Sequence, residues 1–245
     1  MTKDDLQIVV IENLKEHWDN SDVRDLYCDM MKLKLDGYGA VYGENVISAD
    51  KADFFGTHLI VCHKGLRLKP LFGYKSVTLN KCDEFLYKFP ALSLVSSDAE
   101  PECLKELENI LERAKKNNQS ISFDYSWAQD PSIKATRSES MAKMFRDLVM
   151  VLVVNHHKDY EIDEMITCGV VKVKTDQFFD RMGFSKISNK SLFSQADLNG
   201  DDVHVFHTKT YSEYANQVAK EYKDLWDNRL EFSGTEGNVK LKRSA

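Results

Sequence analysis

The stretch SISFDYSWA carries one carboxylate, Asp124, a residue type that can do acid–base chemistry. Apolar and polar residues alternate along residues 120–128, which is the period of a β-strand. Asp124 is therefore expected on the face opposite to Phe123 and Tyr125, with Ser126 following on its own face. A carboxylate there can accept a proton, directly or through water, or it can be a solvated strand residue.

Two cations and two hydroxyls precede a predicted helix in the stretch SIKATRSESMAK. Lys134 and Arg137 supply positive charge, and Ser138 and Ser140 supply hydroxyls at the helix start. The N-terminal end of a helix favours anions because its first backbone N–H groups point outward. We expect these four residues to meet a phosphate group or an acidic protein surface.

Two more carboxylates, Asp50 and Asp53, precede a predicted strand on which His58 lies near the start. They can bind a substrate amine or simply belong to a surface loop, and His58 can be a structural histidine. Arg24 on a predicted helix can clamp a carboxylate or phosphate, or lie on the surface. The residue types alone leave these alternatives open.

The histidines do not predict a metal site. His156 and His157 are adjacent, and adjacent residues on a helix point to different sides. His204 and His207 are three apart on a predicted strand, which places them on opposite faces. We therefore expect neither pair to share an ion, and we expect no metal.

The composition narrows the class of protein. The 245 residues include 33 Lys and Arg against 39 Asp and Glu, for a net charge of −6, which disfavours sequence-independent nucleic-acid binding. The five cysteines are scattered without a CxxC motif, which favours reduced thiols in the cytoplasm. The longest apolar runs, including LVMVLVV, are too short to span a membrane.

The predicted elements alternate between strands and helices. They indicate one mixed α/β domain over residues 1–232, with an inserted helix near 100–118, a C-terminal helix near 211–230 and a flexible tail at 233–245. A hairpin is expected over residues 57–79, and a loop over the three glycines of DGYGAVYGEN. The further expected elements are a strand over 6–11, a helix over 23–35 with Asn20, Ser21 or Asp22 as its cap, a helix over 138–154, a strand over 165–173, a short helix over 175–182 with Thr175 as its cap, and a strand over 203–210.

The C-terminal half resembles the GNAT acyltransferase superfamily. A strand, a long helix, a strand and a short helix lead to FFDRMGF, in which Gly183 and Phe184 end the helix before a strand. The resemblance implies a mixed, mostly antiparallel central sheet, flanked by helices. It also implies that the strand near Met165 diverges from the strand of Asp124 and leaves room for an acyl-pantetheine arm.

The N-terminal half resembles one branch of that superfamily, the acyl-homoserine-lactone autoinducer synthases and the long-chain N-acyl amino acid synthases. In that branch an Arg-bearing helix leads to a loop, an Asp, and a strand that starts near a His. The next strand often ends in Arg-Leu, but here VTLNK lacks the Arg. The resemblance makes Asp124 and Ser126 the catalytic candidates, and it implies a substrate-binding set of Arg24, Tyr27, Asp50, Asp53, His58 and Trp127, the last in place of a usual Arg.

Two further features depart from the superfamily. The glycines that usually hold the coenzyme A pyrophosphate are missing from SIKATRSESMAK, although Lys134, Arg137, Ser138 and Ser140 remain there. The Tyr that often acts as general acid in the short helix is replaced by Phe179. Either another proton donor serves, or the activity has been lost.

The resemblance implies an N-acyltransferase that moves a fatty acyl group from acyl carrier protein or acyl-CoA to a small amine or amino acid. No permanently bound cofactor and no nucleic-acid partner are expected. One alternative is a degenerate GNAT domain that binds an acyl ligand or a partner without catalysis. Another is an ordinary acetyl-CoA-dependent N-acetyltransferase.

Overall fold

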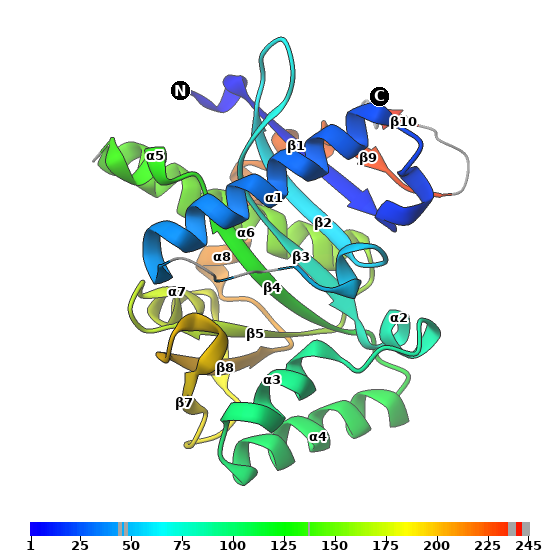
Figure 1. The fold of residues 1–245 in the computed structure, drawn as a ribbon, viewed down its shortest axis with the longest axis vertical. Coiled ribbons are helices and arrows are strands. Elements are labelled where there is room, and N and C mark those ends of the chain that lie inside the picture. The colour runs from blue at the N-terminus through cyan, green and yellow to red at the C-terminus, as the bar shows by residue number, and fades with distance from the viewer. Residues whose placement is uncertain (44–45, 47–48, 137, 235–238, 242–245) are drawn as a thin grey trace. The chain divides into compact units, whose positions relative to one another are not determined.

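The hairpin expected from the sequence forms in the computed structural model (Figure 1), where β2 (Thr57–His63) and β3 (Lys69–Thr78) pair antiparallel. β1 (Leu6–Glu12) pairs antiparallel with β2 and parallel with β9 (Leu230–Phe232). β10 (Val239–Leu241) pairs antiparallel with β9. The strand order in this part is β10-β9-β1-β2-β3. The structure describes residues 1–43, 46, 49–136, 138–234 and 239–241.

The chain divides into two compact units that are built from segments far apart in the sequence. The first unit contains residues 1–76, 126–152 and 218–245, and the second contains residues 77–125 and 153–217. Strand β4 (Ile121–Gln129) and helix α6 (Glu139–Asp159) each contribute residues to both units.

Helix α1 (Ser21–Tyr42) covers one face of the sheet in the first unit (Figure 1). Asn20 caps the helix by accepting from the backbone N–H groups of Asp22 and Val23, and Val23, Leu26, Tyr27, Met30 and Leu33 face the core. Met30 approaches β3 so closely that a Cβ on Gly73 would lie 2.7 Å from its Cε atom. The loop predicted from the glycines was wrong up to residue 42, because the helix continues through Gly37 and Gly39 and ends at Gly43.

The second unit contains a sheet that includes the part of β4 with Asp124. The first half of β4 pairs parallel with β5 (Glu164–Val170), and β5 pairs antiparallel with β8 (Asp201–Thr208). β6 (Ser185–Lys186) and β7 (Leu192–Gln195) also pair with β8. The sheets are thus mixed and mostly antiparallel, as the resemblance implies.

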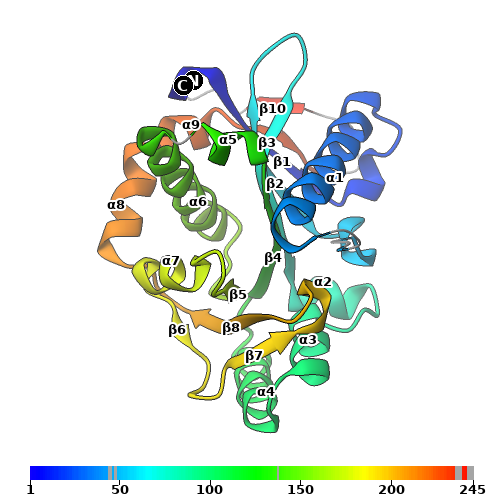
Figure 2. The ribbon, with the colours of Figure 1, turned by 60° about the vertical axis from the view of Figure 1, so that its left-hand side comes forward.

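Three helices between β3 and β4 belong to the second unit. α4 (Pro101–Lys116) is the inserted helix that the sequence predicted, and it lies beside α3 (Pro90–Asp98) (Figure 2). α2 (Leu79–Glu84) precedes them. Arg113 at the end of α4 forms an ion pair of 2.5 Å with Glu164 of β5, which also contacts His207 and Lys209. This buried carboxylate therefore connects the inserted helix to two strands.

The remaining helices differ in detail from the prediction. α7 (Thr175–Met182) begins where expected, but its cap residue is Lys174, and the Thr175 hydroxyl instead contacts the backbone of Val170. The β-branched end of α6 is helical.

The expected C-terminal helix is broken into α8 (Glu213–Glu221) and α9 (Lys223–Asp227), and residues 230–232 form β9 instead. The other helical segments are α5 (Pro131–Ala135), η1 (Lys3–Asp5), η2 (Leu14–His17), η3 (Lys51–Asp53) and η4 (Ala196–Leu198).

Pairing between β4 and β5 stops at one residue pair. The register runs from Ile121 opposite Glu164 to Asp124 opposite Thr167, whereas β4 continues to Gln129 and β5 to Val170. Ser126 has a φ of 62°, in the left-handed region that a residue with a side chain seldom adopts. Pairing between the two strands therefore ends at Asp124. Within the described residues, none of the helices is long and apolar enough to cross a membrane.

Candidate active site

Asp124 is the last residue of β4 that pairs with β5, and its exposed fraction is 0%. Thr167, directly opposite on β5, donates its hydroxyl to the backbone carbonyl of Asp124 at 2.7 Å. This hydrogen bond holds the backbone of the strand at the point where pairing ends. The backbone from which the carboxylate extends is therefore fixed within the second unit.

His157, in the last turn of α6, is a side-chain partner of this carboxylate. Its Nε2 atom lies 3.4 Å from Asp124 Oδ2 and 3.3 Å from the hydroxyl oxygen of Ser122, and its Nδ1 atom contacts the hydroxyl of Tyr211 at 2.5 Å. One tautomer satisfies these contacts: Nε2–H donates to the carboxylate, and Nδ1 accepts from the Tyr211 hydroxyl. Tyr211, His157 and Asp124 thus form a continuous hydrogen-bonded chain, named below the proton chain.

Tyr211 stays protonated in this chain. Burial raises the pKa of its phenol well above the ordinary value, and the nearby charge of Asp124 raises it further. A phenol with a raised pKa donates its hydrogen bond over the whole neutral pH range. The hydroxyl of Tyr211 therefore fixes the tautomer of His157, which in turn presents N–H to Asp124.

Gly183 positions the segment that bears Tyr211. It closes α7 in the left-handed conformation, with a φ of 94°, and the backbone N–H of Ser212 donates to the carbonyl of Met182 at 2.8 Å. A Cβ on Gly183 would lie 2.8 Å from the nitrogen of Ser212. The glycine of FFDRMGF is thus more than a helix stop, because it lets the chain next to Tyr211 pack against the end of α7.

A separate group of buried charges lies in the first unit. Asp53 has no exposed surface, and its carboxylate oxygens lie 3.3 Å from Lys34 Nζ and 3.0 Å from Lys75 Nζ. Lys75 also pairs with Asp50 at 2.9 Å. We call Lys34, Asp50, Asp53 and Lys75 the buried charge cluster, and its formal charges cancel.

The electrostatics of this cluster follow from burial and charge. Burial lowers the pKa of Lys34 to about 8, although Asp53 opposes the shift. Burial acts to raise the pKa of Asp53, but the two ammonium groups outweigh it and hold that pKa below its usual range. His58 has a pKa lowered to about 4, chiefly by burial and then by Lys34, so it is neutral at pH 7. Its Nε2–H donates to the backbone carbonyl of Asp53 at 2.7 Å.

No protein-family profile matches this sequence, and no curated protein sequence does. Among solved structures, FeeM, an N-acyl amino acid synthase from uncultured soil microbes, shares 12% identity over 82% of this chain and 95% of its own, with a TM-score of 0.52. BjaI, a CoA-dependent acyl-homoserine lactone synthase, shares 14% identity over 90% of each chain, with a TM-score of 0.51. This chain has the fold of the GNAT acyltransferases. At such identities the likeness concerns the fold, and the chemistry is argued from the site.

The remaining substrate-binding candidates of the GNAT fold occupy the first unit. Arg24 donates to the backbone carbonyl of Trp18 at 2.7 Å, and the ring of Tyr27 packs against that of His58 with centroids 5.5 Å apart. Trp127 stacks on Tyr74 of β3 at 3.9 Å. Arg24 and Trp127 are therefore held by local contacts, and Tyr27 adjoins the buried charge cluster.

The phosphate-binding candidates are described in part. Arg137 lies outside the described residues, and Lys134 is placed on α5 by its backbone alone. The hydroxyl of Ser138 accepts from the backbone N–H of Met141 at 3.3 Å and lies 3.0 Å from that of Ser140. Ser138 therefore acts as a helix cap for α6, and its role toward a phosphate stays a prediction.

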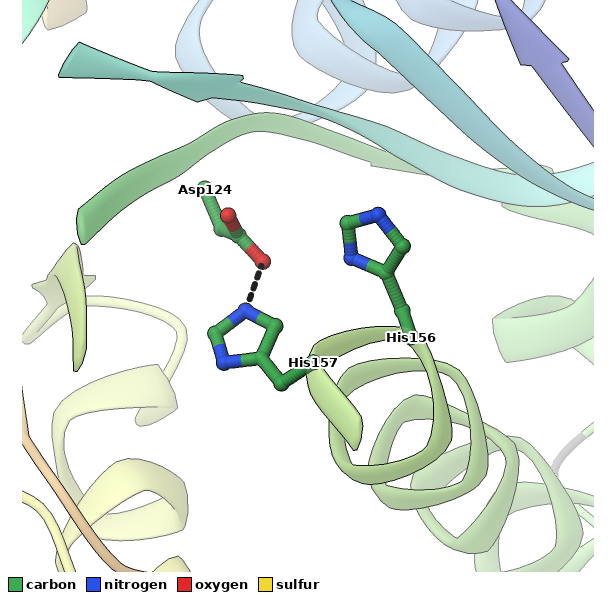
Figure 3. A group of neighbouring side chains, drawn as sticks. All are labelled: Asp124, His156 and His157. Atoms are coloured by element: carbon green, nitrogen blue, oxygen red, sulfur yellow. Dashed lines mark hydrogen bonds and ion pairs between the residues drawn. The ribbon is translucent and has the colours of Figure 1, made fainter. Parts of the chain in front are cut away.

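The adjacent histidines of α6 do not diverge as the spacing argument predicted. His156, His157 and Asp124 each offer a ligand atom, and these atoms lie within 4.8 Å of one another (Figure 3). The rings of His156 and His157 have centroids 5.6 Å apart, because both side chains turn toward β4 at the helix end. His204 and His207 do have different partners, Ser191 and Glu164.

Sequence reasoning missed four residues of these two groups. Lys75 of β3 pairs with Asp50 and Asp53, and Lys34 of α1 pairs with Asp53; only the missing Arg in VTLNK was evident from the sequence. His157 was considered for metal binding but not as the partner of Asp124, and Tyr211 precedes the final helical region without any motif. Phe179, in the place of the usual Tyr, is buried and packs against Phe184 and Phe206.

Proposed function

We propose that this protein is an N-acyltransferase in which Asp124 accepts the proton of the acceptor amine. The observation that carries the proposal is the position of Asp124: a buried carboxylate, hydrogen-bonded to His157, at the last residue of β4 that pairs with β5. The fold likeness to FeeM and BjaI supports the same reaction class.

The chemistry needs one proton to move. The amine nitrogen forms a bond to the thioester carbonyl carbon, and the carbon–sulfur bond breaks. The nitrogen loses one proton and the departing thiolate gains one, so the reaction is balanced. Asp124 can take that proton, directly or through a water, and return it to the sulfur. The N–H of His157 stabilises the carboxylate while it is ionised, so it keeps Asp124 ready to act as a base.

The acyl donor is proposed to be a thioester of acyl carrier protein or coenzyme A, and the acyl group a fatty one. FeeM is an N-acyl amino acid synthase, and BjaI was solved with isopentyl-CoA. The missing glycines before α6 favour a carrier protein, because a partner can present its own phosphate. Lys134, Arg137 and Ser140 are the proposed contacts for that phosphate or for the acidic face of the carrier.

The acceptor is proposed to be a small amine or amino acid. Asp53 is a poor amine ligand because Lys34 and Lys75 already neutralise it. Asp50 has a side chain 30% exposed, so it can meet an amine while it keeps its pair with Lys75. We propose that Asp53, His58 and Tyr27 hold the loop of Asp50 in place, and that Arg24 and Trp127 line the acceptor region. Ser126 is proposed to shape the bend after Asp124.

One observation favours a rival, a GNAT domain that binds an acyl ligand without turnover. The buried Phe179 cannot donate a proton where many relatives of this fold use a Tyr. The test is an acyl-transfer assay with a panel of acyl-carrier-protein and acyl-CoA thioesters and a panel of amino acids and amines, read by mass spectrometry. We expect an N-acyl product with long-chain thioesters. Binding of an acyl thioester without product for any acceptor would favour the rival, and product with acetyl-CoA alone would indicate an acetyltransferase.

A further inference from the structure

We propose that Asp124, His156 and His157 form a binding site for one divalent transition-metal ion. The three side chains come from the first half of β4 and the last turn of α6, and all belong to the second unit. Figure 3 shows the carboxylate and the two imidazole rings reaching from strand and helix toward one another, and their ligand atoms lie within 4.8 Å of one another.

The distances are close to those of a tetrahedral site. Zinc bonds to nitrogen and oxygen of about 2.0–2.2 Å place neighbouring donor atoms about 3.3–3.5 Å apart. His157 Nε2 and Asp124 Oδ2 are already separated by 3.4 Å. Because the other separations do not exceed 4.8 Å, a movement of at most about 1.5 Å of the donor atoms, by adjustment of the side-chain torsions, completes the set.

The ligand types select a class of metal. Calcium and magnesium prefer oxygen ligands throughout, whereas two imidazoles and one carboxylate suit zinc, cobalt, nickel or iron. Three protein ligands leave a fourth position for water or another ligand. The hydroxyl oxygen of Ser122 lies 3.3 Å from His157 Nε2 and is a further polar atom beside the ligand set.

The surroundings also fit a metal. The exposed fractions of Asp124, His156 and His157 are 0%, 1% and 4%, so an ion there would be screened little by water. A buried carboxylate is stabilised by a compensating cation. To bind an ion, Nε2 of His157 must give up its proton, so the ring would carry its proton on Nδ1 and donate it to the hydroxyl oxygen of Tyr211, which would keep Nε2 aimed at the ion as outer partners of metal-bound histidines do.

Occupation of this site has a consequence that rests on the proposed function. A metal ion would take the carboxylate lone pairs that Asp124 uses to accept the amine proton. Acyl transfer would then stop when the ion binds and resume when a chelator removes it. Metal binding itself is measured without substrate, so its result does not depend on whether the protein transfers acyl groups.

The experiment is a titration of metal-stripped protein with Co²⁺ and then with Zn²⁺. The wild type should bind one ion per chain, with the visible absorption of cobalt in a nitrogen and oxygen site, and zinc should displace it. His156→Gln should weaken binding by more than roughly 100-fold, above the loss expected for an outer partner. The matched control is His63→Gln, an exposed histidine on β2 that should leave binding unchanged.

The melting temperature supplies a second reading, because an ion that binds the folded state raises it. Zinc should raise it for the wild type and His63→Gln but not for His156→Gln or Asp124→Asn. Wild-type protein that binds no ion above background overturns the proposal, and so does a folded His156→Gln that binds as tightly as wild type. An active enzyme that binds no metal defeats this inference alone, whereas a protein that binds metal but transfers no acyl group defeats the proposed function alone.

Discussion

The Nε2 atom of His157 lies 3.4 Å from Oδ2 of Asp124, and both side chains are buried. Because little water reaches them, the imidazole and the carboxylate behave as one hydrogen-bonded pair rather than as two solvated groups. Tyr211 extends the pair from the other ring nitrogen. A change at one position of this proton chain should therefore alter the other two.

Tyr211→Phe should weaken both folding and acyl transfer. The substitution leaves the buried Nδ1 of His157 without its donor, which should lower the free energy of unfolding by about 1–3 kcal/mol. It also frees the ring to adopt the other tautomer, so kcat should fall. Urea unfolding and steady-state acyl transfer are the measurements. Tyr214→Phe is the matched control, since that ring is 50% exposed. Equal behaviour of the two variants would show that the hydroxyl of Tyr211 does not matter.

Asp53→Asn should strongly destabilise the first unit. Lys34 and Lys75 would remain buried with half their compensating charge, and breaking a buried ion pair typically costs about 3–5 kcal/mol. Asp50→Asn should cost less, because the Asp50 side chain is 30% exposed and Lys75 keeps Asp53. Chemical denaturation of both variants tests this order. A smaller loss for Asp53→Asn than for Asp50→Asn would contradict the assignment of the buried charge cluster.

The buried ammonium of Lys34 should make stability depend on alkaline pH. Its pKa is about 8 in the folded protein against 10.5 as the ordinary value, so between these values the unfolded chain binds more protons. The free energy of unfolding contributed by Lys34 is therefore lowest below pH 8 and rises with pH up to about 10.5.

The comparison that isolates this effect is wild type against Lys34→Met from pH 7 to pH 10. Titrating groups far from Lys34 are common to both proteins, so their contributions cancel in the difference. The stability of the wild type relative to the variant should increase above pH 8. A difference that stays flat or decreases over this range would argue against a lowered pKa for Lys34.

Gly183→Ala should destabilise the second unit and disturb Tyr211. A residue with a Cβ costs about 1–2 kcal/mol in the left-handed conformation, and the added carbon would lie 2.8 Å from the nitrogen of Ser212. Gly39→Ala is the control, because that helical glycine has open space around it and alanine favours a helix by roughly 0.5–1 kcal/mol. The melting temperature should therefore fall for Gly183→Ala and rise for Gly39→Ala. Equal changes in melting temperature for the two variants would count against this role of Gly183.

Much of the fold was predictable because local patterns agree with tertiary structure. The alternation around Asp124 gave β4, and the periodic apolar residues gave α4 and the long helix α6. Asn20, one of three candidate caps in the sequence, caps α1. The errors lie where packing overrides a local rule: Gly37 and Gly39 do not end α1, and residues 230–232 join β1 as a strand rather than extending a helix.

The candidate site was less predictable because it depends on contacts between distant residues. Asp124 was identified from a strand pattern and a family resemblance, but 33 positions separate it from His157 and 54 separate His157 from Tyr211. Lys75 was overlooked because Arg was sought at the strand end, and the ammonium of a lysine earlier on β3 meets Asp50 and Asp53 instead. No local pattern reports such a contact.

The most direct test is steady-state acyl transfer by the wild type and by Asp124→Asn, with thermal melts of both. The substitution keeps the volume and removes the base, so turnover should fall by roughly 10²–10⁴ while the variant remains folded. Asp202→Asn, an exposed carboxylate on β8, should keep wild-type turnover. A folded Asp124→Asn that transfers acyl groups as fast as the wild type would show that Asp124 is not the base.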